Sequence, residues 1–503
     1  MKKLLAILMA ICMLAGVISL PVIAEEPTDT KDPADTKEPA ADVVLRLSAR
    51  KRNGDTDVIQ DFTNFEDGWN ASMKYAVSDA MENYDRIVVD FYADWEAAEN
   101  GAFTDDWFLN GTGFFWNTIY IGDDRRVTLN LNGHTIDRDL DEYEHDGEVM
   151  YIDEDADVII NNGTITGGWS CNGAGGIHIH DADVVLNNVH VIGNNVEDDD
   201  GAAIALYDNA VLTMNGGSIA DNLVKSVNVT WVYAAGVYVD NSTASFHNVT
   251  FRNNHSGGRS EYKRDQTETY STLGTAIYAT KGTVTIDDCK FYDNAHHRGN
   301  FLDAESVIYA KNSEMTIKNT TFKGNGDVQH FTNGRVPVYL MVKLIVTSKC
   351  DLTIENCHFI NNSAAVLLDM DSKSYLDVSN TVFTDNISTI YRCTVPSVTT
   401  ATTFTNCTFD RNSPPDGSRS FEIPAGGNPP TFVDCDLGNS SFNDRSRATI
   451  VDSDAPNGIG SIIINGSLNH VLVLFSIACS VVALSLTVIF HKKKTAPSTE
   501  DKE

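Results

Sequence analysis

Two acidic runs and a pair of histidines are the residues most able to do chemistry by themselves. The runs are Asp153–Asp155 and Glu197–Asp200, and the pair is His178 and His180, which share one face of an expected strand. Carboxylate oxygens can bind Ca²⁺, but the spacing of these runs matches no calcium-binding loop. Neither histidine has a further metal ligand at a recognisable spacing. The sequence therefore predicts solvated acidic turns, no metal site and no cofactor.

The cysteines between residues 25 and 470 do not follow a zinc-binding pattern. No Cys-x-x-Cys pair occurs, and their odd total argues against a complete disulfide framework. Cys289, Cys357, Cys407 and Cys435 each follow Asn or Asp and come two residues before Phe or Leu. Because Val or Thr fills the same place in other copies of this phrase, we expect buried small side chains. The alternative is a bridge between Cys407 and Cys435, which stand in consecutive copies.

The phrase that contains these cysteines recurs along most of the chain. TVTIDDCKFYDN, EMTIKNTTFKGN and DLTIENCHFINN each have apolar residues at alternating positions, then Asn or Asp, then Phe, then Asn. Eleven such phrases, 24 to 40 residues apart, can be aligned on one apolar residue each: Ile136, Ile165, Val191, Ile219, Phe251, Phe291, Phe322, Phe359, Phe383, Phe409 and Leu437. A period of this length is typical of a solenoid.

Two polar columns flank the aligned position. Three residues before it stands Gly, Asn or Asp in every phrase, and these residue types adopt a left-handed backbone most readily. Three residues after it, eight consecutive phrases have Asn: Asn194, Asn222, Asn254, Asn294, Asn325, Asn362, Asn386 and Asn412. We expect the chain to turn at both places, and the eight amides to form a ladder of hydrogen bonds along the stack.

The apolar columns predict the fold. Alternation with period 2 indicates a strand with one buried face, and the same columns in every phrase indicate one shared core. The predicted core residues are Ile219, Phe251, Phe291, Phe322, Phe359, Phe383 and Phe409. A second strand follows small residues, as in GGIHI from Gly175 and GTAIY from Gly274. Two or three short strands per repeat predict an all-β parallel β-helix solenoid over residues 125–445.

The outward columns of this β-helix offer no evident catalytic site. Enzymes of this architecture that cleave polysaccharides need two or three carboxylates on one outer face of neighbouring coils. The residue just before the aligned position is mostly Thr or Ser, as at Thr164 and Ser218, and this column has no paired acids. His134 falls in an inward column, which predicts a satisfied core histidine. The sequence therefore predicts no catalytic residues.

The repeat resembles a known family of surface proteins. GAAI from Gly201 and GTAI from Gly274, together with FRNN from Phe251, FYDN from Phe291 and FINN from Phe359, are similar to the GGA-I and F-x-x-N repeat of the chlamydial polymorphic outer-membrane proteins. The resemblance implies a right-handed parallel β-helix displayed on a cell surface, often for adhesion. Those proteins end in a membrane β-barrel, whereas this chain ends in one apolar segment.

Both ends of the chain carry membrane signals. Residues 1–24 have two lysines, an apolar run and a small-residue cleavage site, the pattern of a secretory signal peptide, with an uncleaved anchor as the alternative. Residues 471–490 contain no charge and are long enough to cross a bilayer as one helix. The lysines that follow predict a cytoplasmic tail over residues 491–503. We expect a single-pass cell-membrane protein with its ectodomain outside and its C-terminus in the cytoplasm.

The remaining segments connect these parts. Residues 25–41 are rich in Pro, Thr and charges and predict a disordered acidic linker. Residues 42–124 predict an α/β cap, with an amphipathic helix from Trp69 to Tyr84 and a strand at Ile87–Tyr92. Residues 446–470 form a membrane-proximal segment.

The charge limits the partners. The net charge of −33 repels nucleic acid, and repels acidic polysaccharides unless divalent cations bridge them. We expect an adhesin-like binding or structural ectodomain whose ligand is a glycan or a cell-surface protein. The alternative is a surface polysaccharide lyase or glycoside hydrolase. Because insertions carry variation, we expect ligand contacts at residues 259–272 and 328–337.

Overall fold

The computed structural model of the 503-residue chain describes residues 39–96, 118–142, 144, 147–226, 231–258, 271–294, 306–326, 342–371, 373–393, 402–415, 418–423, 429–452 and 461–464. The chain divides into two compact units, residues 1–42 and 43–503. Residues 39–42, the described part of the first unit, end in a turn. The elements below belong to the second unit.

The second unit begins with three antiparallel strands and one helix. The central strand β1 (Leu45–Lys51) pairs with β2 (Thr56–Phe62) on one side and β3 (Tyr84–Phe91) on the other. The helix α2 (Phe65–Ala76) starts where the Asn64 side chain accepts a hydrogen bond from the backbone N–H of Asp67. It buries Trp69 and Met73. The 3₁₀ helix η1 (Asp79–Asn83) follows.

The helix expected from Trp69 to Tyr84 is therefore wrong at both ends. The observed helix α2 ends early because Ser78 donates its backbone N–H and its hydroxyl to the Tyr75 carbonyl, at 3.0 and 2.7 Å. These bonds turn the chain at a point where the apolar spacing alone suggested that the helix continues.

From β3 onward the strands pair in parallel, one coil above the next. One face of the coils is an 11-stranded sheet. Its strands are β5 (Ile119–Ile121), β8 (Met150–Ile152), β11 (Ile177–His180), β14 (Ile204–Tyr207), β18 (Val237–Asp240), β23 (Ile277–Thr280), β26 (Ser306–Lys311), β29 (Lys343–Ser348), β32 (Ser363–Met370), β35 (Ile387–Cys393) and β38 (Phe421–Glu422).

The strands of the recurring phrase form the other large sheet, in two rows separated by a corner. The first row contains β6 (Arg126–Asn130), β9 (Asp157–Thr166), β12 (Asp183–Ile192), β15 (Val211–Ala220), β19 (Thr243–His247), β24 (Thr283–Asp287), β27 (Glu314–Lys318), β30 (Asp351–Glu355), β33 (Tyr375–Ser379), β36 (Thr402–Thr405), β39 (Thr431–Val433) and β40 (Thr449–Asp452). The second row contains β4 (Trp95–Glu96), β7 (Thr135–Asp137), β20 (Thr250–Arg252), β25 (Lys290–Tyr292), β28 (Thr321–Lys323), β31 (His358–Ile360), β34 (Val382–Thr384) and β37 (Thr408–Asp410), and the long strands β9, β12 and β15 run through both rows.

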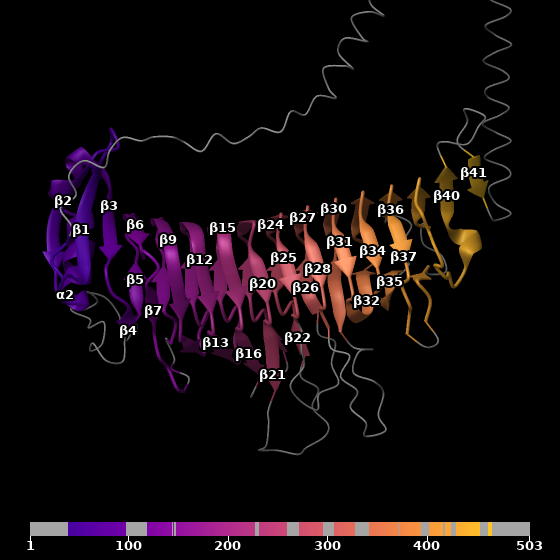
Figure 1. Cartoon of the computed structure of the whole chain (residues 1–503), viewed down its shortest axis with the longest axis horizontal. Helices are drawn as coiled ribbons and strands as arrows, with labels where there is room; N and C mark the ends of the chain where they lie inside the picture. The colour runs from indigo at the N-terminus through magenta and orange to yellow at the C-terminus, as the bar shows by residue number, and fades with distance from the viewer. Residues whose placement is uncertain are drawn as a thin grey trace, which may run out of the picture. The chain divides into compact units, whose positions relative to one another are not determined.

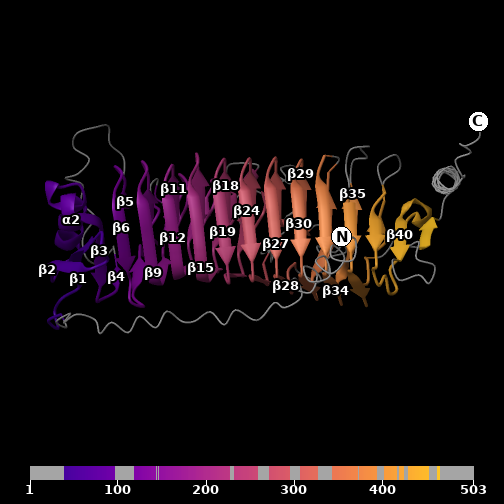
Figure 2. The same cartoon turned by 90° about the horizontal axis from the view of Figure 1, so that it is seen from above.

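Successive coils lie side by side along one axis, with equivalent strands in a row (Figures 1 and 2). The predicted corners explain this regularity. In every phrase the residue three before the aligned position has a positive φ, for example 54° at Asn356 and 52° at Asn406. The left-handed backbone at this column bends each coil at the same point, so that the strands of the next coil fall into register.

Smaller sheets flank the 11-stranded sheet and the two rows of the other large sheet. A four-stranded parallel sheet contains β10 (Trp169–Ser170), β13 (Asn195–Glu197), β16 (Leu223–Ser226) and β21 (His255–Gly258), and a two-stranded sheet contains β17 (Trp231–Tyr233) and β22 (Ser271–Leu273). After the 3₁₀ helix η3 (Arg445–Arg447), β40 pairs antiparallel with β41 (Ser461–Ile464). Parallel pairing thus runs from β3 to β40, beyond the expected limits of 125 and 445 at both ends.

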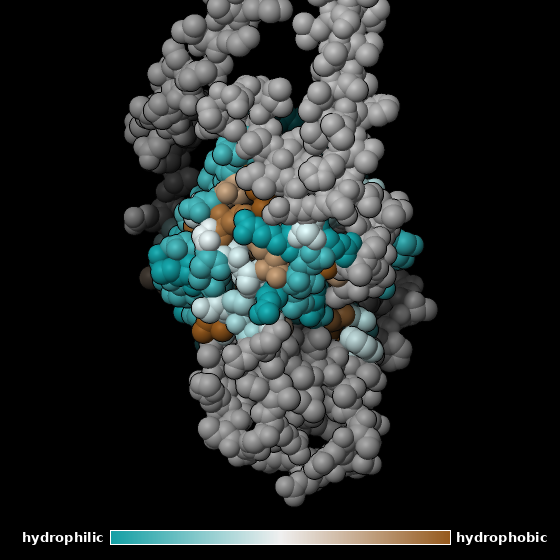
Figure 3. All heavy atoms as spheres, turned by 90° about the vertical axis from the view of Figure 1, so that its right-hand side faces the viewer, coloured by the Kyte–Doolittle hydropathy of each residue, from teal (hydrophilic) through white to brown (hydrophobic). Residues whose placement is uncertain are grey.

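Figure 3 looks onto the end of the stack where β40 and β41 lie. The described surface there is mainly hydrophilic, with small hydrophobic areas between. No helix in the described ranges is long and apolar enough to cross a bilayer. The expected signal peptide, nearly all of the linker, the transmembrane segment 471–490 and the tail lie outside those ranges.

Candidate functional site

The eight predicted asparagines form one buried column. From Asn222 to Asn386, each side-chain amide nitrogen donates to the side-chain oxygen of the Asn in the next coil, at 2.9–3.1 Å. The bond from Asn194 to Asn222 is longer, at 3.4 Å. The same amide also donates to the backbone carbonyl of the preceding coil, as from Asn325 to Phe291 at 2.8 Å. Every amide is therefore used to join coils.

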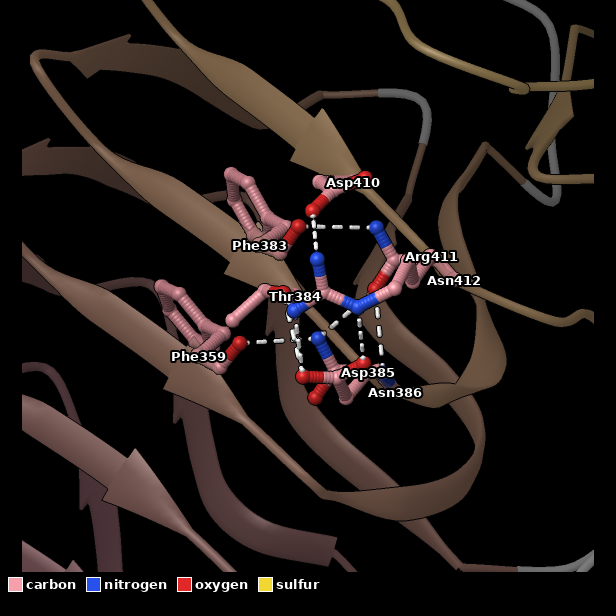
Figure 4. A network of polar contacts seen from close by, with 8 residues as sticks. All are labelled: Phe359, Phe383, Thr384, Asp385, Asn386, Asp410, Arg411 and Asn412. Atoms are coloured by element: carbon pink, nitrogen blue, oxygen red, sulfur yellow. Dashed lines mark hydrogen bonds and ion pairs between the residues drawn. The ribbon is translucent and has the colours of Figure 1, made fainter.

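Figure 4 shows two steps of this column. Asn386 donates to the Phe359 carbonyl at 2.8 Å and to Asn412 at 2.9 Å. On the outer side of the same corner, the Arg411 guanidinium holds the Asp385 carboxylate with two bonds of 2.7 and 2.9 Å. The inner ladder and the outer ion pair both connect neighbouring coils.

The predicted core residues stack one above another. Phe251, Phe291, Phe322, Phe359, Phe383 and Phe409 are fully buried, and consecutive rings lie 4.5–5.0 Å apart with 2–15° between their planes. Ile219 continues this column through its pairing with Phe251 and is also buried. The column fills the interior and leaves no space for a substrate.

The cysteine column points inward. Cys289, Cys357 and Cys407 are buried, Cys435 is half-buried, and all four are free thiols. Burial raises the pKa of Cys289 and of Cys357 to about 12, so both remain protonated at neutral pH. The thiols of these coils thus act as small apolar side chains.

His134 is not the core histidine that its column suggested. Its side chain is 32% exposed, and its Nδ1 lies 3.2 Å from Asp94 Oδ1. The alignment of the phrases places Leu131 opposite Ile160. In the structure Leu129 takes this place, because the corner of the first coil is two residues longer. The two additional residues turn His134 away from the interior.

A continuous line of aromatic rings runs along the outer face of the 11-stranded sheet. We call it the aromatic strip, and it consists of Tyr120, Tyr151, His178, Tyr207, Tyr238, Tyr278 and Tyr309. Six of these residues occupy one outward column in seven consecutive strands, β5 to β26, where Ala205 has the remaining place. Tyr207, two residues further along β14, fills the gap above this alanine.

The rings of the strip contact each other face to face at one end. Tyr238, Tyr278 and Tyr309 have centroids 5.3–5.4 Å apart and planes only 3–4° apart. Tyr233 of β17 lies 4.4 Å from the Tyr278 ring. Tyr238 and Tyr278 are buried, so the half-buried Tyr309 is the one of these three that a ligand can reach.

Two carboxylates lie beside the middle of the strip. Asp199 accepts the backbone N–H of Gly173, and Asp200 accepts that of Tyr233, both at 2.9 Å. Burial, followed by the charge of Asp199, raises the pKa of Asp200 to about 8. Burial also raises the pKa of Asp199. Asp200 is therefore mostly protonated at neutral pH and can donate a hydrogen bond.

All four residues of Glu197–Asp200 are half-buried, which corrects the prediction of a solvated acidic turn. The run is partly covered because β17 returns to bind it through Tyr233, a contact between coils that sequence spacing does not show. The other run is more open: Glu154 and Asp155 are exposed, and Tyr120 donates its hydroxyl to Glu154 at 3.3 Å.

The two histidines of β11 have different surroundings. His180 contacts Asp153 through Nδ1 at 2.7 Å and Asp208 through Nε2 at 3.2 Å. Burial opposes its charge, but the two carboxylates together raise its pKa. His178 stands in the strip, and burial, followed by the charge of His180, lowers its pKa to about 4. Its Nδ1 is buried without a hydrogen-bond partner in the described structure.

Beyond Tyr309 the same outward column changes character. Val346 comes next, and then Asp369, which is buried between Lys343 at 2.9 Å and Arg392, whose two nitrogens lie 2.8 and 3.0 Å away. The hydrogen bonds with Asp369 raise the pKa of Arg392. This carboxylate is fully paired, so the part of the column open to a ligand ends at Tyr309.

The aromatic strip was not among the sites expected from the sequence, although part of its signal is visible there. A tyrosine follows the first inward residue in IYI, MYI, VYV, IYA and IYA of strands β5, β8, β18, β23 and β26. The contribution of Tyr207 depends on Ala205 leaving space, which only the packing reveals. Among the described residues, no group of three or more His, Cys, Asp or Glu could hold a metal ion. The insertions expected to contact a ligand lie largely outside the described ranges.

Comparison with known proteins agrees with the architecture. The family model described as "Right handed beta helix region" matches residues 223–470. No curated protein and no solved structure matches the chain. The parallel sheets and this match support a β-helix protein, with a right-handed β-helix region over residues 223–470.

Proposed function

We propose that this is a membrane-anchored cell-surface protein whose β-helix serves as an adhesin-like binding ectodomain. The anchoring part of the proposal is supported by residues 1–24 and 471–490, with their signal-peptide and transmembrane patterns. The antiparallel strands β1 and β2, which extend the sheet beyond β3, would close the first coil.

The aromatic strip is the observation that supports binding. Tyrosine is enriched in protein interfaces because its ring is apolar and its hydroxyl can form hydrogen bonds. Here seven rings follow one another over consecutive coils, and Tyr151, Tyr207 and Tyr309 are half-buried rather than fully covered. Asp153 and Asp208 add acceptor oxygens beside the strip. We propose that an extended ligand on another cell, a glycan or a protein, lies along this line.

Binding by the full-length protein displayed on cells tests this proposal. Tyr151→Phe and Tyr309→Phe keep the rings and remove the hydroxyls. We expect the double variant to bind the array glycan or partner cell that the wild type binds, but at least about tenfold more weakly than the wild type. Thr164→Ala with Thr321→Ala is the matched control, because these outward residues lie on the other sheet. Surface labelling checks equal display. Unchanged binding by the tyrosine variant would contradict the proposal.

A surface polysaccharide lyase or glycoside hydrolase is a second candidate, favoured by Asp200. A carboxyl group that stays protonated near neutral pH can act as a general acid, and Asp199 beside it supplies a second carboxylate. Incubation with a panel of polysaccharides, followed by assay of reducing ends and unsaturated products, tests it. Activity that Asp200→Asn abolishes would support the enzyme, and no activity on any member would leave binding as the function.

A further inference from the structure

Cys407 and Cys435 stand directly above one another at the C-terminal end of the cysteine column. Thr405 pairs with Val433 and Thr408 forms a bridge with Asp436, so the register places Cys407 opposite Cys435. The backbone N–H of Cys407 lies 3.4 Å from the Cys435 sulfur. Neighbouring parallel strands are about 4.8 Å apart, which falls within the Cα separation that a disulfide requires.

The other cysteines of the column lack such a neighbour. The backbone N–H of Cys289 donates to the Thr320 hydroxyl of the next coil, and that of Cys357 donates to the Thr381 hydroxyl, both at 3.2 Å. Cys289 is also contacted from the coil before it by Val249. Cys407 is thus the member of the column whose following neighbour is a second thiol.

The two thiols differ in access and acidity. Cys435 is half-buried, whereas Cys407 is 1% exposed. The hydrogen bond with Cys407 lowers the pKa of Cys435, and the same bond, followed by burial, raises the pKa of Cys407. The more exposed sulfur is therefore the better nucleophile, and the buried one is placed to react second.

We propose that Cys407 and Cys435 form a disulfide that ties together the last two coils of the repeat. The oxidant is a low-molecular-weight disulfide. The Cys435 thiolate attacks one sulfur of that disulfide, which gives a mixed disulfide and releases one thiolate. Cys407 then loses its proton and attacks the Cys435 sulfur, which releases the second thiolate. The chain loses two electrons and two protons, and the oxidant becomes two thiols.

The position gives the bond a structural purpose. It closes a loop from Cys407 to Cys435 that contains β37, β38 and β39, at the end of the stack where fewer coils hold each strand. If the C-terminal segment anchors the protein, force on the ectodomain reaches the last coil first. A covalent link there would keep that coil from opening.

Peptide mapping of the full-length protein in detergent tests the proposal without any substitution. After incubation with oxidised glutathione and alkylation of remaining thiols, we expect a peptide pair joined through Cys407 and Cys435, unalkylated at both positions, and a Tm about 5 °C above that of the reduced protein. Cys289 and Cys357, freed by denaturation, should be alkylated. Recovery of Cys407 and Cys435 as alkylated thiols, or of a different pairing, would overturn the proposal.

A matched pair of variants completes the experiment. Cys435→Thr introduces the residue that this column has at Thr320 and Thr381, and it should abolish the rise in Tm on oxidation. Cys357→Thr makes the same change in a coil without a thiol neighbour, and it should retain the full rise. Equal responses of the two variants would show that the stabilisation comes from another bond and would contradict the proposal.

Discussion

Asn325 illustrates what one polar side chain does inside this β-helix. It is fully buried, donates to the Phe291 carbonyl and to Asn362, and accepts from the side chain and backbone of Asn294. A buried polar group without a partner costs about 1–3 kcal/mol, so the column is stable only when it is complete. The ladder therefore fixes both the identity of the residue and the register of the coil.

Replacing this amide tests the ladder. Asn325→Ala leaves the Phe291 carbonyl and the backbone N–H of Asn294 without their partner, and we expect the free energy of unfolding to fall by about 2–4 kcal/mol. Urea denaturation followed by circular dichroism measures it. Lys323→Ala, at an exposed position two residues earlier, should change the value by less than about 0.5 kcal/mol. Equal effects of the two changes would contradict the role of the ladder.

Asp200 predicts a pH dependence of stability. Its pKa in the folded protein, about 8, lies above that of an unfolded aspartate, so the folded state binds the proton more tightly. The stability that this proton provides is complete below about pH 4 and is lost as the pH rises to about 8. The Tm of Asp200→Asn should therefore fall less over this interval than that of the wild type. Asp183→Asn, at an exposed position of β12, should keep the wild-type slope of Tm against pH. A flatter slope in this control than in Asp200→Asn would contradict the assignment to Asp200.

At the scale of the element, the corners decide where each strand ends. Asn356 has a φ of 54°, and its side chain donates to Asn319 of the preceding coil at 2.6 Å. A left-handed backbone is tolerated by Asn and Gly and is strained for β-branched residues. The corner column thus has two tasks, since the backbone must turn and the side chains connect the coils.

Substitutions at this corner separate the two tasks. Asn356→Gly loses the bond to Asn319 but accepts the backbone, and it should cost about 0.5–1 kcal/mol. Asn356→Val adds the strain of a β-branched residue at positive φ, and it should cost about 1–3 kcal/mol more. Thermal unfolding of both variants measures the difference. If valine were tolerated as well as glycine, the left-handed corner would not be needed for folding.

At the scale of the whole molecule, the β-helix behaves as a stack in which each coil contacts only its neighbours. Leu352 pairs with Leu376, and the coils there repeat after 24 residues, as the bond from Asn362 to Asn386 shows. In such a stack the stability is approximately the sum of coils and of the interfaces between them. The register therefore matters more than the number of coils.

Deleting one coil tests this view. Removal of residues 353–376 joins Leu352 to Asp377 in register, and we expect a folded protein whose β-helix is shorter by about 4.8 Å. Removal of residues 353–375 leaves one residue too many, which turns the following side chains to the opposite face of the strand. The second deletion should lose the cooperative unfolding transition that the first retains. Equal folding of both would show that register is not decisive.

Much of the fold could be predicted because its signals are local. The corners depend on which residues accept a positive φ, and Asn380 and Asn406 adopt the backbone that their type suggested. The core phenylalanines follow from period 2 and recur in six consecutive coils, from Phe251 to Phe409. The helix α2 was placed less well, since a hydrogen bond from Ser78 rather than apolar spacing sets its end. The position of His134 was wrong because the pattern did not reveal the two additional residues of the first corner.

By itself, the sequence determined that the chain coils, where each coil turns and which residues fill the interior, because each of these depends on the type of one residue repeated at a fixed spacing. Only the tertiary structure decided what lies on the outer faces. Tyr207 joins the aromatic strip because Ala205 leaves room beneath the neighbouring rings, and Asp200 is half-buried because β17 returns to contact it. Such contacts join residues of different coils, so their energies depend on packing in three dimensions rather than on any local pattern.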